Sequence, residues 1–343
     1  MTDSGAHRAA VIGCGDVSVV HFAAIAGMPD AELVAVCDTD PDRLAAAAAA
    51  YRVPGYADVE QLLREQSPDV VHICTPHDTH ARLAIQALEA GAEVLLEKPV
   101  AHDRGEAARL IDVAERTRGR IAVCFQNRYN PPVAALKALL ESGVPGSVLG
   151  ASATVFWHRD ADYYRARPWR GTWAGGGGGL MMNQAIHTVD LLHWLLGDVV
   201  DVAGGASTRL LSEVIEVEDT ADLVLTHASG AVSVLFATLS NAVNAPVTID
   251  IEAEHARLAL RGDLSVTYAD GRVEVVAEPE TATGERSYWG LSHERLIRDF
   301  YDGIGRGDPF WIDPHEANAA LGIVQDLYDL AYPARTAHEK ERS

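Results

Sequence analysis

The sequence predicts an α/β chain, in which a doubly wound parallel sheet is followed by a second, α+β domain with an open-faced antiparallel sheet. Three observations predict it. Short apolar runs alternate with helical patterns in the first half, a glycine-rich turn ends the first of these runs, and alternating apolar and polar residues fill much of the second half. The 343 residues are enough for two domains.

The strands of the first half are expected to be buried on both faces, because their apolar runs show no alternation. These runs are Ala9–Gly13, Leu33–Cys37, Val70–Cys74, Val94–Leu96 and Ile121–Phe125. Between them lie segments with helical spacing, notably Pro41–Tyr51, Thr79–Ala90 and Glu106–Arg116. Strand and helix in repetition predict a parallel sheet with right-handed crossovers.

The second half has strands that alternate, which is typical of an antiparallel sheet with one covered face. They are Ser147–Trp157, Ala221–His227, Ala231–Leu239, Val247–Glu254 and Arg272–Val276, with a hairpin turn at 228–230. Helices are expected at Met181–Leu196, Leu291–Ile304 and Pro314–Leu330. We therefore predict domains at residues 1–127 and 128–343, with the last helix packing back on the first domain.

Charge and composition exclude several classes of function. The net charge of −21 argues against a nucleic-acid partner, since phosphate binding needs a basic face. No apolar run reaches the ~20 residues of a membrane span, and the start MTDSGAHRAA does not resemble a signal peptide, so we expect a cytoplasmic protein with no membrane partner. The four cysteines (Cys14, Cys37, Cys74 and Cys124) are scattered, which predicts neither disulfides nor a metal site.

The turn 13-GCGDVS-18 predicts a dinucleotide site. Gly13 allows the tight turn, Gly15 allows close approach of a pyrophosphate, and the small Ser18 permits close packing of the next helix. Asp16 and Val17 complete the turn. Asp38 follows 23 positions after Gly15, where an acid binds the adenosine ribose and repels a 2′-phosphate. The predicted cofactor is therefore NAD; the alternative for Asp38 is a solvated turn residue in 38-DTDPD-42.

A helix that follows five glycines carries Asn183 and His187 one turn apart, and we expect the glycines to let the backbone come close to a ligand. A lone histidine on an apolar helix is more often a hydrogen-bonded core residue than a catalyst. Motifs elsewhere in the sequence favour the catalytic interpretation of His187.

Four segments carry a family resemblance: 74-CTPHDTH-80, 97-EKPV-100, 126-QNRYNP-131 and the glycine-rich helix. In this order they resemble the Gfo/Idh/MocA oxidoreductases over essentially the whole chain. The resemblance implies a Rossmann domain, an open-faced sheet that forms a homodimer or homotetramer interface, and oxidation of a secondary hydroxyl of a carbohydrate or cyclitol with NAD.

The resemblance also implies residue roles. Lys98 matches the catalytic lysine and His187 the general base, while Asn183 stands where many members have aspartate. A surface lysine is the alternative for Lys98. The remaining cofactor-binding residues implied are Thr75, Pro76, His80, Glu97, Lys98, Gln126, Trp169 and Arg170.

The segment 157–173 is rich in aromatic residues and arginines, which stack on sugar rings and hold anionic groups. It predicts a substrate pocket for a molecule with an anionic group; the alternative is a surface loop whose arginines pair with acids. The substrate-binding residues expected are Asn183, Arg128, Arg159, Tyr164 and Trp169.

We therefore expect an NAD-dependent dehydrogenase of a sugar, sugar derivative or cyclitol. One alternative is an NAD-dependent glycosidase that oxidises a ring carbon, eliminates the aglycone and reduces the ring again. The other is a sugar or nucleotide sensor without catalytic activity.

Overall fold

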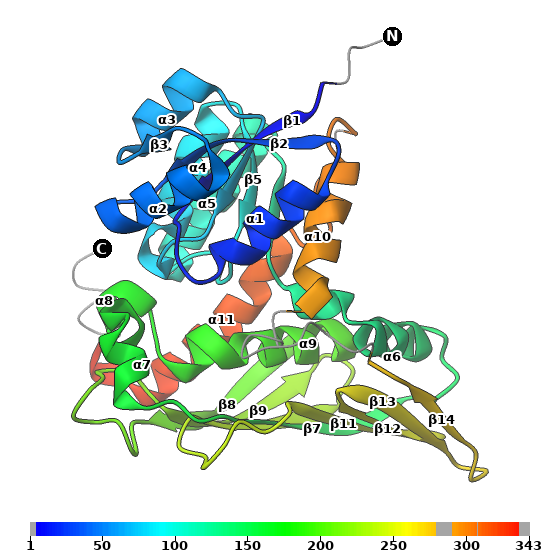
Figure 1. Ribbon diagram of the computed structural model, residues 1–343. Helices are drawn as coiled ribbons and strands as arrows, with labels where there is room; N and C mark the ends of the chain where they lie inside the picture. Colours follow the sequence, from blue (N-terminus) through cyan, green and yellow to red (C-terminus); the bar gives the residue numbers. More distant parts are fainter. Residues whose placement is uncertain (1–4, 279–289, 307, 336–343) are drawn as a thin grey trace. The chain divides into compact units, whose positions relative to one another are not determined.

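The computed structural model describes residues 5–278, 290–306 and 308–335. It divides into two compact units (Figure 1). The first comprises the chain up to Gln126 together with Thr281–Asn318, and the second comprises Asn127–Glu280 together with Ala319 onwards. Helix α11 (Pro314–Ala331) begins in the first unit and ends in the second.

The first unit contains a parallel six-stranded sheet in the order β3-β2-β1-β4-β5-β6. This order reverses between β1 and β4, and in such sheets ligands bind beyond the carboxyl ends of the strands at the reversal. The strands are β1 (His7–Ile12), β2 (Ala31–Cys37), β3 (Gly55–Tyr56), β4 (Val70–Ile73), β5 (Glu93–Leu96) and β6 (Ile121–Val123). Residues 70–73 and 121–123 are buried throughout, as the lack of alternation predicts.

Several helices of the first unit begin at an aspartate whose carboxylate accepts backbone N–H groups of the first turn. Asp40, Asp58 and Asp103 cap α2, α3 and α5 in this way. The helices are α1 (Ser18–Gly27), α2 (Pro41–Tyr51), α3 (Val59–Gln66), α4 (His80–Glu89), α5 (Arg104–Thr117) and α10 (Gly290–Asp302). Helix α10 packs against α1.

The second unit contains an eight-stranded sheet in the order β14-β13-β12-β11-β7-β10-β9-β8. All neighbours are antiparallel except β7 and β10, which are parallel. The strands are β7 (Val148–Phe156), β8 (Val199–Ser207), β9 (Thr220–His227), β10 (Val232–Thr238), β11 (Thr248–Ala253), β12 (Ala256–Arg261), β13 (Asp263–Tyr268) and β14 (Val273–Val276). Burial alternates along β10, so one face is covered and the other is exposed.

Helices α6 (Pro131–Glu141) and α9 (Ile186–Leu196) pack on this sheet, on the side that Figure 1 shows above it. A π-helical segment, η4 (Met181–Ala185), leads directly into α9. Short helical segments α7 (Ala161–Arg165), η3 (Pro168–Gly171) and α8 (Trp173–Gly176) form the stretch between β7 and η4.

The predicted fold class is confirmed, including the parallel sheet and the largely antiparallel second sheet. Six elements were not predicted from the sequence: β3, β8, β12, β13, α3 and α6. Strands β12 and β13 are six residues each and are separated by Gly262 alone, so their alternation is too short to stand out. Within the described residues, no helix is long and apolar enough to cross a membrane.

Candidate active site

The glycine-rich turn follows β1 and leads into α1. Gly13 has φ +89°, and a Cβ added there would lie 2.6 Å from the carbonyl oxygen of Cys74, so only glycine fits. A Cβ on Gly15 would meet open space among the described residues, which leaves the backbone accessible to a ligand. The Ser18 hydroxyl donates to the Gly15 carbonyl at 2.7 Å and thereby fixes the turn. Asp16 and Val17 lie in the turn, with Val17 directly before the helix.

Asp38 directly follows β2 and is largely buried. Its Oδ2 accepts the backbone N–H of Cys14 at 2.7 Å, and its Oδ1 accepts that of Asp40 at 2.8 Å. The carboxylate therefore joins the glycine-rich turn to the loop after β2. Each oxygen keeps a further lone pair with which it can accept a ribose hydroxyl.

His80 links the two loops that follow β4 and β5. Its Nδ1 lies 2.7 Å from the carbonyl oxygen of Pro99 and its Nε2 lies 2.9 Å from that of Thr75. Burial lowers the pKa of His80, and the two carbonyl contacts act in the opposite direction. The ring holds the Thr75–Pro76 segment beside the segment that contains Lys98.

Lys98 lies directly after the buried Glu97, two residues beyond the end of β5, and is half-buried. Glu97 does not extend into solvent: its Oε1 contacts His21 Nε2 at 3.1 Å and His293 Nε2 at 3.0 Å. Gln126, at the start of η2 (Gln126–Tyr129), has a buried side-chain oxygen with no hydrogen-bond partner among the described residues.

These features suit a dinucleotide. The Gly15 backbone is accessible to a ligand, and the Asp38 carboxylate is held in place by hydrogen bonds. The buried side-chain oxygen of Gln126 can accept a hydrogen bond from a bound ligand. The residues that would hold NAD in the first unit are thus those of the glycine-rich turn, Asp38 and Gln126.

The glycine run before η4 serves the protein's own packing. A Cβ on Gly178 would lie 2.2 Å from the Tyr328 hydroxyl, and one on Gly179 would lie 2.1 Å from the Glu218 carbonyl oxygen. We expected these glycines to let a ligand approach; instead, both are needed for contacts inside the second unit.

Glu218 was not predicted, yet it anchors the start of the helix that carries His187. Its carboxylate accepts the backbone N–H groups of Gly179 (3.0 Å) and Met181 (2.8 Å) and the hydroxyl of Tyr328 (2.7 Å). Burial raises the pKa of Glu218, and these hydrogen bonds oppose that effect. No sequence signal marks this residue, because it lies 39 positions from Gly179.

Asn183 lies in the π-helical segment, and His187 follows at the start of α9; both are half-buried. Segments of π-helix are rare and frequently occur at functional sites. The Tyr163 hydroxyl lies 3.1 Å from Gln184 Nε2 and 3.5 Å from Asn183 Nδ2. Tyr163 thus joins this group, whereas the predicted Tyr164 is buried with 3% of its surface exposed.

Arg128 is buried in the second unit. Its Nε and Nη2 donate to the two carboxylate oxygens of Asp190 at 3.0 and 2.6 Å, and its guanidinium lies over the Trp194 ring. Arg128 was expected to contact substrate, and its burial argues against a direct contact. The pair holds η2 to α9.

Arg159 and Arg170 both lie against the Tyr163 ring, with guanidinium-to-ring distances of 5.1 and 4.6 Å. Arg159 also lies 5.2 Å from the Trp157 ring, and Arg170 lies 5.6 Å from the Trp169 ring. We call these five residues the arginine–aromatic ladder. The hydrogen bonds of Arg159 go to His158 O and Asn244 Oδ1, which are uncharged.

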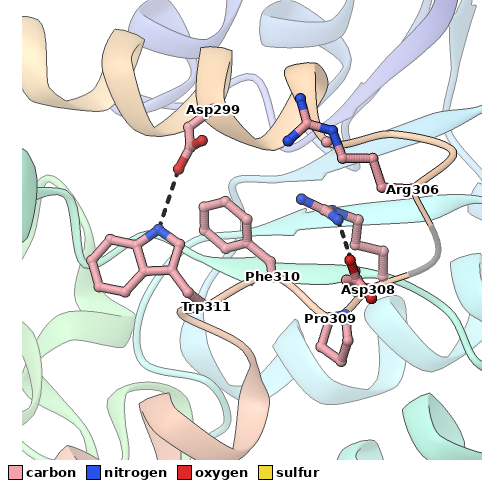
Figure 2. A pocket seen from close by; sticks show the side chains of 8 residues that line it. Asp299, Arg306, Asp308, Pro309, Phe310 and Trp311 are labelled. Carbon is pink, nitrogen blue, oxygen red and sulfur yellow. Dashed lines mark hydrogen bonds between the residues drawn. The ribbon is translucent and has the colours of Figure 1, made fainter.

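The first unit also contains a hollow, lined by residues of its C-terminal segment and by Arg120 (Figure 2). Trp311 donates to Asp299 at 3.2 Å on one side of it, and Arg120 donates to the carbonyl oxygen of Asp308 at 2.7 Å on the other. None of the predicted site residues lines it.

Comparison with known proteins agrees with this geometry. The model of an oxidoreductase family with an NAD-binding Rossmann fold (GFO_IDH_MocA) matches residues 7–125, and the model of the GFO/IDH/MocA C-terminal domain matches residues 133–259. A D-apiose dehydrogenase of Paraburkholderia graminis is 30% identical, with 97% of this chain and 90% of the relative covered. An inositol 2-dehydrogenase of Rhizobium meliloti is 27% identical, with 81% and 79% covered.

A solved structure is similar over nearly the whole chain. The WlbA dehydrogenase of Bordetella pertussis, in complex with NADH and UDP-GlcNAcA, is 30% identical with a TM-score of 0.81. The match covers 94% of this chain and 95% of that one.

Proposed function

This chain belongs to the Gfo/Idh/MocA family of NAD-binding oxidoreductases, and on that premise we propose that it oxidises a secondary hydroxyl of a sugar, sugar derivative or cyclitol. The observation that carries the proposal is the occurrence of two suitable groups in one chain: Lys98 just beyond the end of β5 and His187 on α9. The relatives named for apiose and inositol support the substrate class.

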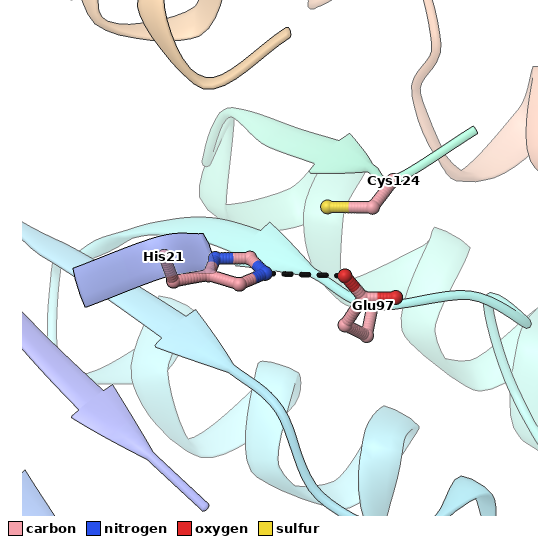
Figure 3. Close-up of side chains that lie close together, drawn as sticks. All are labelled: His21, Glu97 and Cys124. Atoms are coloured by element: carbon pink, nitrogen blue, oxygen red, sulfur yellow. Dashed lines mark hydrogen bonds and ion pairs between the residues drawn. The ribbon is translucent and has the colours of Figure 1, made fainter. Parts of the chain in front are cut away.

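In this proposal His187 accepts the proton of the reacting hydroxyl, and the Lys98 ammonium stabilises the developing alkoxide. NAD, when bound, supplies the hydride acceptor. Asn183 cannot relay a proton, but its amide can donate to a substrate hydroxyl and orient it. The other cofactor contacts that we propose, at Thr75, Pro76, Trp169 and Arg170, rest on the family resemblance; the buried carboxylate of the predicted Glu97 is held by His21 (Figure 3) and His293 instead.

We further propose that the substrate has an anionic group, held by the arginine–aromatic ladder. A guanidinium binds carboxylate or phosphate through two parallel hydrogen bonds, and the rings offer stacking surfaces for a sugar. Support comes from the two arginines that lie against Tyr163, whose hydroxyl is close to Asn183. Arg159 is the residue that we assign to direct contact.

We propose that the exposed face of the second sheet forms a homodimer or homotetramer interface. Val232, Val234 and Phe236 project from β10 and are each about 40% exposed, and Val224 opposite Val234 on β9 is also exposed. Apolar surface of this kind marks interaction sites. We also assign the protein to the cytoplasm, which suits four cysteines outside any disulfide.

The test is incubation of the purified protein with NAD and a panel of neutral and anionic sugars, cyclitols and glycosides. Absorbance of NADH and release of an aglycone are followed together. A dehydrogenase accumulates NADH, whereas an NAD-dependent glycosidase releases aglycone without net NADH. If no member of the panel yields either product while NAD binds, the sensor alternative is supported and the proposal is wrong.

A further inference from the structure

The helix formed by η4 and α9 begins at a carboxylate that is distant in the sequence. Glu218, two residues before β9, is fully buried. Its Oε2 accepts the backbone N–H of Gly179 at 3.0 Å, and its Oε1 accepts that of Met181 at 2.8 Å. Its backbone carbonyl oxygen accepts the N–H of Leu180 at 3.1 Å. One residue therefore binds three consecutive N–H groups at the start of the helix.

These N–H groups are among those that a helix cannot satisfy by itself, because the carbonyl groups four residues earlier lie outside it. In many helices a polar side chain directly before the first turn accepts them. Leu180 and Ala185, which precede η4 and α9, have apolar side chains that cannot do so. Glu218 takes the place of this cap from a distant part of the second unit.

Tyr328 of α11 adds a further contact to the same carboxylate. Its hydroxyl donates to Glu218 Oε1 at 2.7 Å, and its ring packs edge-on against Trp173, with 5.1 Å between the centroids. Gly178 approaches this hydroxyl so closely that a side chain would not fit there. The start of the helix is therefore fixed by packing as well as by hydrogen bonds.

The same helix is also fixed beyond His187, where Asp190 receives two hydrogen bonds from the buried Arg128. Between these two fixed points lies the π-helical segment η4. Its hydrogen bonds skip one residue more than those of an α-helix. A return to the α-helical register would rotate the residues on one side of it by about 100° relative to those on the other, because 3.6 residues make one turn. Asn183 lies within η4 and His187 follows it, so their relative direction depends on this register.

We propose that Glu218 is a positioning residue: by binding the three N–H groups, it holds η4 in its π-helical form and so sets the direction of Asn183 relative to His187. This role rests on the proposed function of these two residues. Segments of π-helix are rare, which indicates that a chain adopts them where its surroundings impose them. Here the constraint comes from Glu218 at one end and from the Arg128–Asp190 pair at the other.

Glu218→Gln tests the proposal with little change in volume. A glutamine amide has one acceptor oxygen, so its NH₂ group would face the backbone N–H of either Gly179 or Met181. We expect the backbone amides of residues 179–187 to exchange with deuterium at least about tenfold faster than in the wild type. Tyr328→Phe removes one donor and keeps the ring, and it should produce a smaller increase at the same residues.

Asp219→Asn is the matched control. Asp219 is also fully buried, and its carboxylate likewise accepts three consecutive backbone N–H groups, those of residues 209–211. This substitution should also lower the stability of the protein, but it should speed exchange at residues 209–211 and not at 179–187. The pair of variants separates a local effect on the helix from a general loss of stability.

The second readout is kcat for a substrate that the wild type oxidises. A displacement of about 1 Å in a reacting group can lower the rate about 100-fold, so Glu218→Gln should lower kcat by about 10- to 100-fold. The Kd for NAD, which we assign mainly to the first unit, should change little. Asp219→Asn should keep the kcat of the wild type.

Unchanged exchange at residues 179–187 in folded Glu218→Gln would overturn the proposal. Faster exchange with the kcat of the wild type would overturn it as well, because Glu218 would then anchor the helix without positioning the reacting groups. If Glu218→Gln does not fold, the wild type decides: its Gly179 and Met181 amides should exchange at least about 100-fold more slowly than in an unstructured peptide, and unprotected amides would overturn the proposal. If the wild type oxidises no member of the panel, the proposed function fails, and the exchange experiment, which needs no substrate, still decides whether Glu218 fixes the helix.

Discussion

Arg128 and Asp190 form a two-bond ion pair in the core of the second unit, and Asp190 lies one turn after His187 on α9. A carboxylate at this distance from a candidate base could in principle orient the imidazole. In the structure both oxygens of the Asp190 carboxylate accept hydrogen bonds from Arg128 instead. The pair therefore fixes the helix that presents His187.

Replacing only one member of the Arg128–Asp190 pair should destabilise the protein strongly. Asp190→Asn leaves the buried guanidinium without a counter-charge, which typically lowers the free energy of unfolding by about 3–5 kcal/mol. Denaturant titration of Asp190→Asn, Arg128→Met and the double variant Arg128→Met/Asp190→Leu measures the effect. The double variant should recover most of the loss; equal losses in all three would show that packing, and not the unpaired charge, dominates.

The stability of the protein should fall as the pH drops below about 6.5. His21, His72 and His80 are buried and their folded-state pKa values are lowered, so the unfolded chain binds more protons in that range. Each such group contributes a slope of up to about 1.4 kcal/mol per pH unit.

His72→Gln tests this slope, because the glutamine amide can still donate towards His21 and accept from Tyr301 without titrating. Its unfolding free energy, measured from pH 7 to pH 5, should fall less steeply than that of the wild type. His255→Gln, at an exposed position, is the control and should keep the full slope. Parallel curves for wild type and His72→Gln would show that His72 does not contribute to this pH dependence.

NAD should be preferred to NADP, because the Asp38 carboxylate repels a 2′-phosphate. We expect kcat/KM to be at least about tenfold higher with NAD, and Asp38→Ala to narrow the gap. Asp38→Asn is the sharper variant, since it keeps an acceptor for the backbone of the turn and loses the charge. Asp42→Asn, an exposed acid in α2, should leave the ratio unchanged. Comparable kcat/KM values for the two cofactors in wild type would refute this prediction.

Arg159→Ala should weaken binding of an anionic substrate. Loss of a hydrogen bond to a charged group is worth about 1.5–3 kcal/mol, so KM should rise by roughly 10- to 100-fold with little change in kcat. Arg165→Ala is the control, because Arg165 is exposed in the same segment and pairs with Asp162. If the best substrate is a small neutral polyol and Arg159→Ala leaves its KM unaltered, the ladder has no role in recognition.

The parts of the fold that the sequence predicts are those marked by local signals. Buried strands, the turn at Gly13–Ser18 and the capped helix Pro41–Tyr51 each show their pattern within about ten residues. The parts that it did not predict depend on residues far apart in the chain. Glu97 lies 196 positions from His293, and Glu218 lies 39 positions from Gly179.

The glycine run was correctly predicted to allow a close approach to the backbone, but the group that approaches Gly178 and Gly179 is not a ligand. Consecutive glycines indicate close backbone approach. From sequence, the approaching partner could be a ligand or the protein itself, and the contacts of Gly178 and Gly179 with Tyr328 and Glu218 identify the protein.

The central claim is that Lys98 and His187 act on the chemical step and not on cofactor binding. Its most direct test is the single-turnover rate of NADH formation at saturating NAD and substrate, with NAD affinity measured separately by calorimetry. Lys98→Ala and His187→Ala should each slow that rate by about 10²–10⁴-fold while the Kd for NAD changes little, and Lys137→Ala should match the wild type. A near-normal rate in His187→Ala would contradict the account and place the base elsewhere, with Tyr163 the next candidate.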